Sequence, residues 1–222
     1  MIKAIFFDAA GTLIYLRKPV GQTYAKIAAG HGLEIEPSLL ERAFKTTWKT
    51  SPAPVRSANV PSEDDDRSWW HDLAAETFRS ALGKSVSEET FEPLFENLYT
   101  HFAKPEAWQV YDDTFEALEF FKRQARLFVL SNFDRRLHSV LEGLKLTPFF
   151  ENVLVSSEIG FSKPDPRIFE AALQIANVPA SACLHIGDDD RCDFQGAQSA
   201  GWQTFLLQRP TIDLLSISKK LP

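Results

Sequence analysis

Short, largely apolar runs recur along the chain and are separated by segments whose apolar residues have helical spacing. Such runs are typical of strands that are covered on both faces, as in a parallel sheet. Strands that alternate with helices predict an α/β fold with right-handed crossovers between parallel strands. The five predicted strands lie at Ala4–Phe7, Leu127–Leu130, Asn152–Val155, Ala182–Ile186 and Thr204–Leu207.

The predicted core is therefore Rossmann-like, with three layers and a five-stranded parallel sheet. A long segment with only helical patterns interrupts the alternation after the first strand. We expect this segment, residues 16–104, to be an inserted helical cap domain, within a core formed by residues 1–15 and 105–222. The helical stretches are Gln22–His31, Pro37–Lys49, one that ends at Leu82, and Ser87–Phe102, with a proline-rich loop at Ser51–Asp66.

Aspartate residues mark where some of the later helices begin. Asp112 or Asp113 can cap the helix that follows, and Asp165 can cap a helix that has Pro166 at its first position. After the last strand we expect Ser216–Pro222 to form a weakly ordered tail.

Composition and charge limit the class of partner. The 222 residues carry a formal net charge of -6, which argues against a nucleic-acid-binding protein with a basic face. No apolar run approaches the ~18 residues of a membrane span, and the N-terminus lacks a signal-peptide pattern. We therefore expect a cytoplasmic protein with no membrane partner. Its two cysteines do not form a disulfide framework.

Chemically useful side chains stand at the ends of the predicted strands. Asp8, Ser131 and Asp188 each lie at the carboxyl end of an apolar run, and Lys163 lies just before a helix. The carboxyl ends of parallel strands form the edge where open α/β sheets bind ligands. Asp8 and Asp188 offer oxygen ligands to a hard cation, while Ser131 and Lys163 can bind an anion. The pattern predicts a phosphoryl-binding site with a carboxylate nucleophile.

The same segments resemble a known family. The chain is similar to the haloacid dehalogenase-like superfamily, in particular to its metal-dependent, phosphatase-like members with a helical cap. The resemblance covers nearly the whole chain and rests on the order and spacing of four motifs. They are FFDAAGTL at Phe6–Leu13, LSNFD at Leu130–Asp134, SKPDP at Ser162–Pro166 and HIGDDDRCDFQGA at His185–Ala197.

The resemblance implies a Mg²⁺-dependent hydrolase that acts on a small phosphorylated metabolite through an aspartyl-phosphate. Asp8 would be the nucleophile, Ser131 and Asn132 would contact the phosphoryl group, and Lys163 would balance its charge. The inserted helical block would be a mobile cap that closes over the site. The resemblance leaves open whether the protein is a monomer or a homodimer.

The resemblance also implies a set of metal ligands. Mg²⁺ would be bound by Asp8, by the backbone carbonyl of Ala10 and by Asp188. Asp193 would be a further ligand or would support the ligands, and Asp189 is a weaker candidate for that role. For substrate contacts from the cap region, the candidates are Arg17, where the chain enters the cap, and Arg56, in the proline-rich loop.

Ala10 departs from the pattern of the family's phosphatases, which carry a second aspartate at this position as the general acid and base. The methyl group of Ala10 cannot transfer a proton, and general acid–base catalysis contributes about 10²–10⁴-fold in rate. Three interpretations stay open. The protein is a slow or specialised phosphatase, with His71 or His101 as weak candidates for a proton carrier. It cleaves C–P bonds like the phosphonoacetaldehyde hydrolases, which form a Schiff base on a cap lysine. Or it binds a phosphorylated ligand without catalysis. The lysines in the cap region are Lys18, Lys26, Lys45, Lys49 and Lys84.

Overall fold

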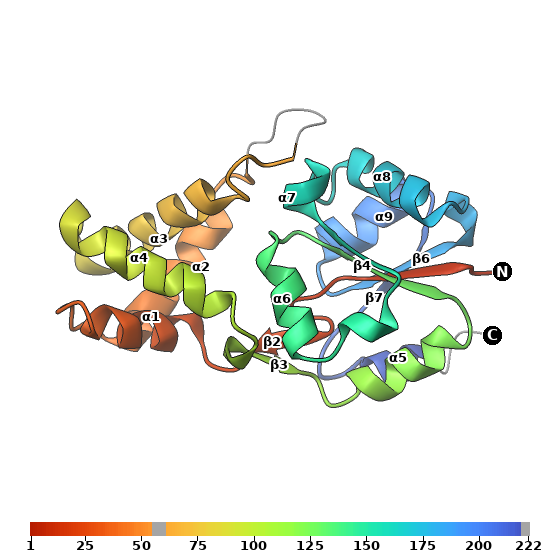
Figure 1. The fold of residues 1–222 in the computed structure, drawn as a ribbon, viewed down its shortest axis with the longest axis horizontal. Coiled ribbons are helices and arrows are strands. Elements are labelled where there is room, and N and C mark those ends of the chain that lie inside the picture. The colour runs from red at the N-terminus through yellow and green to blue at the C-terminus, as the bar shows by residue number, and fades with distance from the viewer. Residues whose placement is uncertain (55–60, 219–222) are drawn as a thin grey trace. The chain divides into compact units, whose positions relative to one another are not determined.

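The computed structural model describes residues 1–54 and 61–218. The chain folds into two compact units (Figure 1). The first, here named the α/β unit, contains Met1–Tyr15, Arg56–Asp65 and Gln109–Pro222, and the second, the helical unit, contains Leu16–Val55 and Asp66–Trp108. That the helical unit acts as a cap stays a prediction.

Within the described residues, a five-stranded sheet forms the centre of the α/β unit, in the order β5-β4-β1-β6-β7. Every neighbouring pair of strands is parallel, which confirms the predicted Rossmann-like α/β fold. Since β1 lies between β4 and β6, the strand order reverses there, and such a switch point is where open α/β sheets bind ligands. The strands are β1 (Ala4–Phe7), β4 (Arg126–Ser131), β5 (Asn152–Val155), β6 (Cys183–Gly187) and β7 (Gln203–Leu206).

Helices cover both faces of this sheet, with α8 and α9 on one side and α5 on the other (Figure 1). Successive residues of a strand point to opposite faces. Phe6 stacks on Phe128, with ring centroids 4.8 Å apart, in a core cluster that includes Phe169 of α8. Phe7 instead meets Phe121 of α5, at 5.5 Å. Both faces are therefore apolar, which explains why the first strand lacks polar alternation. The helices are α5 (Thr114–Lys122), α6 (Arg136–Gly143), α7 (Ser156–Ile159), α8 (Pro166–Ala176), α9 (Gly196–Ser199) and α10 (Leu214–Ser218).

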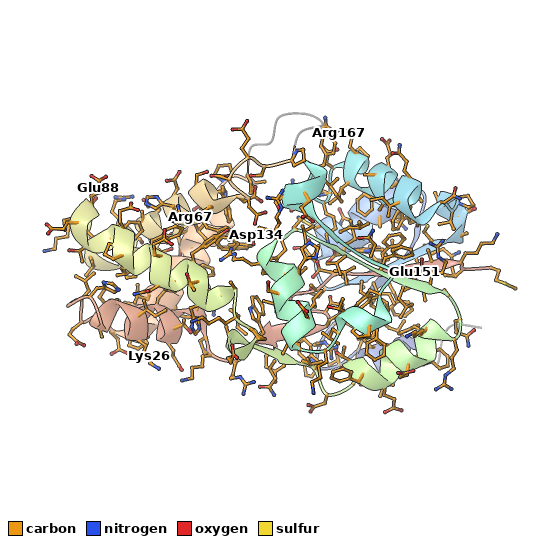
Figure 2. The ribbon with its side chains drawn as sticks, in the orientation of Figure 1. Lys26, Arg67, Glu88, Asp134, Glu151 and Arg167 are labelled. Atoms are coloured by element: carbon orange, nitrogen blue, oxygen red, sulfur yellow. The ribbon has the colours of Figure 1, made fainter. Side chains whose placement is uncertain are left out.

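Aspartates accept backbone hydrogen bonds at the starts of helices in this unit. Asp165 accepts a hydrogen bond from the Arg167 backbone N–H at 3.0 Å, which confirms the predicted cap of α8. Asp134, labelled in Figure 2, does the same for the N–H of Arg136 at 3.1 Å and forms an ion pair with the Arg136 guanidinium at 2.6 Å. Each carboxylate satisfies a backbone donor that would otherwise have no partner within its helix.

Two predictions for the ends of elements are wrong. Asp113 lies at the N-cap of α5, but its side chain makes no capping hydrogen bond there, because it is paired with Arg209 and accepts from the Leu214 backbone N–H. Residues Ser216–Ser218 of the predicted tail are ordered, because they belong to α10, which packs against α5 and buries Ile217. Residues 219–222 of the predicted tail lie outside the described residues.

Among the described residues, the helical unit contains four α-helices, in the stretches that the sequence pattern predicts, and a short 3-10 helix at Pro105–Ala107. The four α-helices enclose a core of their own, in which Tyr24 stacks on Phe78 with ring centroids 5.6 Å apart. At the surface, Arg67 lies over the Phe95 ring at 5.1 Å (Figure 2). The helices are α1 (Val20–Ala29), α2 (Pro37–Thr50), α3 (Arg67–Leu82) and α4 (Glu88–Phe102).

A separate two-stranded sheet is formed by β2 (Ile14–Leu16) and β3 (Trp108–Val110), which the sequence pattern did not predict because three-residue strands carry almost no periodicity. Backbone hydrogen bonds flank the pair: the Arg17 N–H donates to the Ala107 carbonyl at 2.9 Å, and the Tyr111 N–H donates to the Leu13 carbonyl at 3.1 Å. Among the helices within residues 1–54 and 61–218, none has the length and apolar character needed to cross a bilayer.

Candidate functional site

Asp8 lies at the point where the central strand leaves the sheet. Its backbone N–H donates to the Ile186 carbonyl of β6 at 2.9 Å, so the strand pairing fixes where the side chain begins. On one side of β1, Ser131 is the last residue of β4, and on the other side Asp188 directly follows β6. The parallel register thus brings together three polar groups that are far apart in the sequence.

Lys163 is the cation of this cluster. Its Nζ donates to Asp8 Oδ1 at 2.8 Å, to Asp193 Oδ1 at 2.5 Å and to the Leu130 carbonyl at 2.8 Å, and its side chain is 1% exposed. The Ser131 hydroxyl donates to the same Asp8 Oδ1 at 3.0 Å. One oxygen of Asp8 is therefore held by two donors from two different segments.

Both carboxylate oxygens of Asp193 have hydrogen-bond partners. Besides Lys163, its Oδ1 faces His185 Nε2 at 2.9 Å, and its Oδ2 accepts from the Asp189 backbone N–H at 3.0 Å. A carboxylate only accepts hydrogen bonds, so the proton of His185 sits on Nε2. Since both oxygens of Asp193 already have partners, its clearest role is to position Lys163.

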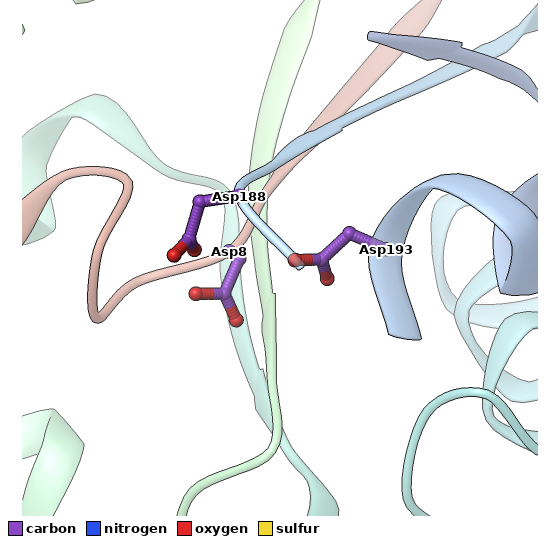
Figure 3. Close-up of side chains that lie close together, drawn as sticks. All are labelled: Asp8, Asp188 and Asp193. Carbon is purple, nitrogen blue, oxygen red and sulfur yellow. The ribbon is translucent and has the colours of Figure 1, made fainter. Parts of the chain in front are cut away.

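Three carboxylates converge at this edge of the sheet. Asp8, Asp188 and Asp193 each offer one oxygen, and these oxygens lie within 4.8 Å of one another. Figure 3 shows Asp188 and Asp193 pointing toward Asp8. Among the described residues, Lys163 is the cation that forms ion pairs with the cluster, so an excess of two negative charges remains. Asp188 is exposed, while Asp8 and Asp193 are buried.

The pKa values reflect this imbalance. Burial raises the pKa of Asp8 to about 6; Lys163 opposes the rise, and the neighbouring carboxylates of Asp193 and Asp188 add to it. Burial alone would also raise the pKa of Asp193, but Lys163 and the hydrogen bond from His185 outweigh it and hold that pKa below its usual value. Asp193 is stabilised as an anion by both Lys163 and His185, whereas Asp8 has Lys163 and two neighbouring carboxylates, so the pKa values of the two groups shift in opposite directions.

The pKa values of Asp188 and Lys163 are also set by burial and by the neighbouring charges. The protein around the Asp188 carboxyl group raises its pKa, and Asp193 adds to the rise. Burial would lower the pKa of Lys163, but Asp193 and Asp8 outweigh that effect and raise it. The lysine is therefore charged, and the carboxylates still carry uncompensated negative charge.

These residues fit a divalent cation. A charge of +2 would balance the excess, and carboxylate oxygens are the ligands that Mg²⁺ prefers. The loop after β1 is shaped around Asp188: Thr12 Oγ1 donates to Asp188 Oδ1 at 3.2 Å, and a Cβ added to Gly11 would lie 2.7 Å from that same oxygen. The absence of a side chain at Gly11 is what lets the carboxylate of Asp188 approach the loop.

The other candidates lie around this centre or away from it. Asn132 is exposed, and its side chain bonds the Lys163 backbone in both directions: Nδ2 donates to the Lys163 carbonyl at 2.8 Å and Oδ1 accepts from its N–H at 2.7 Å. Asp189 accepts from the Cys192 backbone N–H at 2.6 Å and is outside the three-carboxylate cluster. Ala10 is half-buried in the loop after β1. Both Asn132 and Asp189 are thus engaged in shaping loops.

The predicted substrate contacts of Arg17 and Arg56 are not tested by this structure. Arg17 belongs to the helical unit, where its guanidinium donates to the Trp108 carbonyl at 3.4 Å. Arg56 lies outside the described residues. Their contact with a substrate stays a prediction.

Two contributors were missed from the sequence. His185 is a single polar residue inside an apolar strand, which is the signal that could have identified it as a partner of Asp193. Arg209 donates to the Thr12 carbonyl at 2.8 Å, across 197 positions of sequence, and no local pattern marks it.

Comparisons with known proteins agree with this geometry. Residues 2–201 match the family described as haloacid dehalogenase-like hydrolase. The human haloacid dehalogenase-like hydrolase domain-containing protein 3 is 39% identical over 210 residues, which cover 94% of this chain and 83% of the human protein.

Solved structures share the fold. A Bacillus subtilis HAD-hydrolase, described as bound to magnesium, superimposes with a TM-score of 0.73 at 18% identity, covering 99% of this chain and 98% of that one. A HAD phosphatase from Thermococcus onnurineus has a TM-score of 0.66 at 19% identity, covering 99% and 97%.

Proposed function

The chain belongs to the haloacid dehalogenase-like hydrolases, and from that premise we propose that it is a Mg²⁺-dependent hydrolase of a small phosphorylated molecule, with Asp8 as the nucleophile. The observation that carries the proposal is the excess of two negative charges where Asp8, Asp188 and Asp193 meet a single lysine. A site built this way gains free energy from a divalent cation and from the anion that such a cation attracts.

The two oxygens of Asp8 have different surroundings. Hydrogen bonds from the described residues to its side chain all end on Oδ1, which accepts from Ser131 and Lys163. Oδ2 is the oxygen left to attack, and the Asp8 side chain is 11% exposed, enough to admit a reactant. Held at one oxygen and open at the other, the carboxylate is oriented before the substrate arrives.

The proposed reaction has two steps. Asp8 Oδ2 forms a bond to phosphorus while the bond between phosphorus and the leaving oxygen breaks, which gives an aspartyl-phosphate. Water then attacks that phosphorus, releases phosphate and restores the carboxylate. Lys163 and the Ser131 hydroxyl would stabilise the charge on the phosphoryl oxygens. When bound by Asp8, Asp188 and the Ala10 carbonyl, Mg²⁺ would supply further charge neutralisation.

Ala10 sets the expected substrate preference within this scheme. Its methyl group cannot protonate the leaving oxygen or activate water, so each step loses the help of a general acid or base. A leaving group that is stable as an anion needs no proton, so acyl and aryl phosphates should react faster than alkyl phosphates.

Phosphate release from an acyl, an aryl and an alkyl phosphate, with Mg²⁺ or with EDTA, tests the proposal. We expect Mg²⁺-dependent turnover that falls steeply from the acyl to the alkyl compound and that Asp8→Asn abolishes. Asp190→Asn is the matched control: this exposed aspartate directly follows Asp189, at the start of the π-helix Asp190–Gln195, but lies outside the three-carboxylate cluster, and we expect turnover to be retained.

Other outcomes would identify the alternatives. Tight phosphate binding without any turnover would replace the enzyme with a phospholigand-binding protein. A lysine adduct trapped by borohydride in the presence of a phosphonoaldehyde would favour C–P bond cleavage. Turnover that persists in Asp8→Asn would remove the proposed nucleophile.

A further inference from the structure

Arg209 reaches the loop after β1 from the far end of the sequence. It lies just beyond β7, in a turn that closes on itself where the Ile212 N–H donates to the Gln208 carbonyl at 2.8 Å. Arg209 Nη2 donates to the Thr12 carbonyl at 2.8 Å, and the Thr12 hydroxyl donates to Asp188 Oδ1 at 3.2 Å. Two consecutive hydrogen bonds thus connect Arg209 to a predicted metal ligand.

The guanidinium is itself held in one orientation. Arg209 Nη1 pairs with Asp113 Oδ1 at 2.9 Å, and the two side chains are only 14% and 10% exposed. Its plane lies over the Tyr111 ring, with Cζ 3.6 Å from the ring centroid. The other oxygen of Asp113 accepts from the Leu214 backbone N–H at 2.6 Å. An arginine held by a carboxylate and by an aromatic ring can act as a rigid donor.

The loop needs such a donor at Thr12. Thr12 is fully buried, and a buried carbonyl without a partner is costly. The neighbouring carbonyls receive donors from nearby: the Ala9 carbonyl from Leu13 at 2.8 Å, and the Leu13 carbonyl from Tyr111 at 3.1 Å and from the Thr114 hydroxyl at 3.1 Å. Arg209 completes this set, so the peptide between Thr12 and Leu13 is held from outside the loop.

We propose that Arg209 is a positioning residue: by fixing the Thr12 carbonyl it orients the Thr12 hydroxyl toward Asp188, and it thereby sets the affinity of the site for Mg²⁺. The inference rests on the proposed function for the identity of the metal ligands. The placement of the loop by Arg209 does not depend on it.

The chain contains a matched control. Arg126, at the opposite end of the sheet, makes the same three kinds of contact as Arg209: with the carboxylate of Glu151 at 2.6 Å, with the Ala176 carbonyl at 2.6 Å and with the Phe128 ring at 5.2 Å. Glu151 is labelled in Figure 2. Arg126→Met removes these interactions without touching the loop after β1.

The test uses Arg209→Met, Arg209→Lys and Arg126→Met in the full chain. Hydrogen exchange of the peptide spanning residues 9–14 is measured without metal, and Mg²⁺ affinity is measured by calorimetry. We expect Arg209→Met to speed exchange in that peptide and to weaken Mg²⁺ binding by about 10-fold, the lower end of the effect of losing a direct partner of a metal ligand, because Arg209 contacts Thr12 and not Asp188 itself. Arg209→Lys should lie between Arg209→Met and wild type, and Arg126→Met should leave Mg²⁺ affinity unchanged.

A double-mutant cycle separates positioning from general destabilisation. Thr12→Val removes the hydroxyl that contacts Asp188. If Arg209 acts through Thr12, the double variant should bind Mg²⁺ no more weakly than Thr12→Val alone. Additive losses would overturn the proposal, as would an equal loss of affinity in Arg126→Met. If Arg209→Met does not fold, the Mg²⁺ affinity of Arg209→Lys is used in its place.

Different measurements contradict the proposed function and the role of Arg209. If the wild-type protein does not bind Mg²⁺, the proposed function is contradicted, and the exchange data alone decide whether Arg209 places the loop. Faster exchange confined to residues 9–14 in Arg209→Met would then support the placement, and unchanged exchange would overturn it.

Discussion

Gly11 offers a direct test of how tightly the loop after β1 fits around Asp188. Its φ of +94° lies in the left-handed region, and a Cβ at this position would stand 2.7 Å from both Cγ and Oδ1 of Asp188. Real Cβ atoms do not approach other atoms this closely, so Gly11→Ala must move the loop, the carboxylate or both.

The cost has two parts that can be separated. A side chain in the left-handed region costs about 1–2 kcal/mol in the free energy of unfolding. Displacing the carboxylate of Asp188 should in addition weaken Mg²⁺ binding by about 10–100-fold, which is about 1.4–2.8 kcal/mol of binding free energy. The first part is common to any glycine with positive φ, whereas the second depends on Asp188.

Gly32→Ala is the control for the first part. Gly32 has a φ of +78°, and a Cβ there meets no described atom within 4 Å. Urea denaturation gives the free energy of unfolding of each variant, and calorimetric titration gives its Mg²⁺ affinity. We expect both variants to lose similar stability without metal, and only Gly11→Ala to lose Mg²⁺ affinity.

Two results would refute this reasoning. Wild-type Mg²⁺ affinity in Gly11→Ala would mean that Asp188 does not bind the metal from the observed position. Equal loss of affinity in Gly32→Ala would mean that binding follows overall stability rather than the geometry of the loop.

Three further changes test other parts of the structure. Ala10→Asp should raise kcat for alkyl phosphates by about 10²–10⁴-fold, because it restores a general acid and base; phosphate release measures this. Lys163→Met removes the ammonium between Asp8 and Asp193 and should lower the free energy of unfolding without metal by about 3–5 kcal/mol in urea denaturation. Phe128→Ala should cost about 3–5 kcal/mol in the same assay, because this fully buried ring stacks on Phe6.

Each of these has an outcome that would count against it. An inert Ala10→Asp variant would place the catalytic defect elsewhere in the site. Wild-type stability in Lys163→Met would mean that the carboxylates do not need this cation. For the core, Phe115→Ala is the reference: this ring is 41% exposed, so its loss should cost less than about 0.5 kcal/mol.

The positions of the site residues that lie at the ends of strands could be predicted from the sequence. Asp8, Ser131 and Asp188 are each adjacent to a buried run, and parallel pairing brings such positions to one edge whatever the strand order. The family resemblance carried by the four motifs is confirmed by the matching family and by the human relative. The predicted five-stranded parallel sheet is also confirmed. Its strands could be predicted because each one is marked by a local apolar run in the sequence.

Contacts between distant charged residues were not predictable. Asp113 precedes a helix as a cap would, yet its carboxylate pairs with Arg209, on a segment nearly a hundred positions away. That ion pair and the bond from Arg209 to Thr12 depend on where the turn after β7 folds back, which periodicity does not encode. The ordered Leu214–Ser218 helix was missed for a related reason: five residues are too few to show a helical repeat, and its order comes from packing against α5.

The pairing of β2 with β3 means that the chain first leaves the α/β unit and last returns to it along two adjoining strands, while residues 61–65, between α2 and α3, also belong to the α/β unit. An insertion whose ends adjoin can be lengthened, exchanged or lost without opening the scaffold that surrounds it. The helices α1–α4 can therefore diverge in sequence while Asp8 and Lys163, which both belong to the α/β unit, keep their positions.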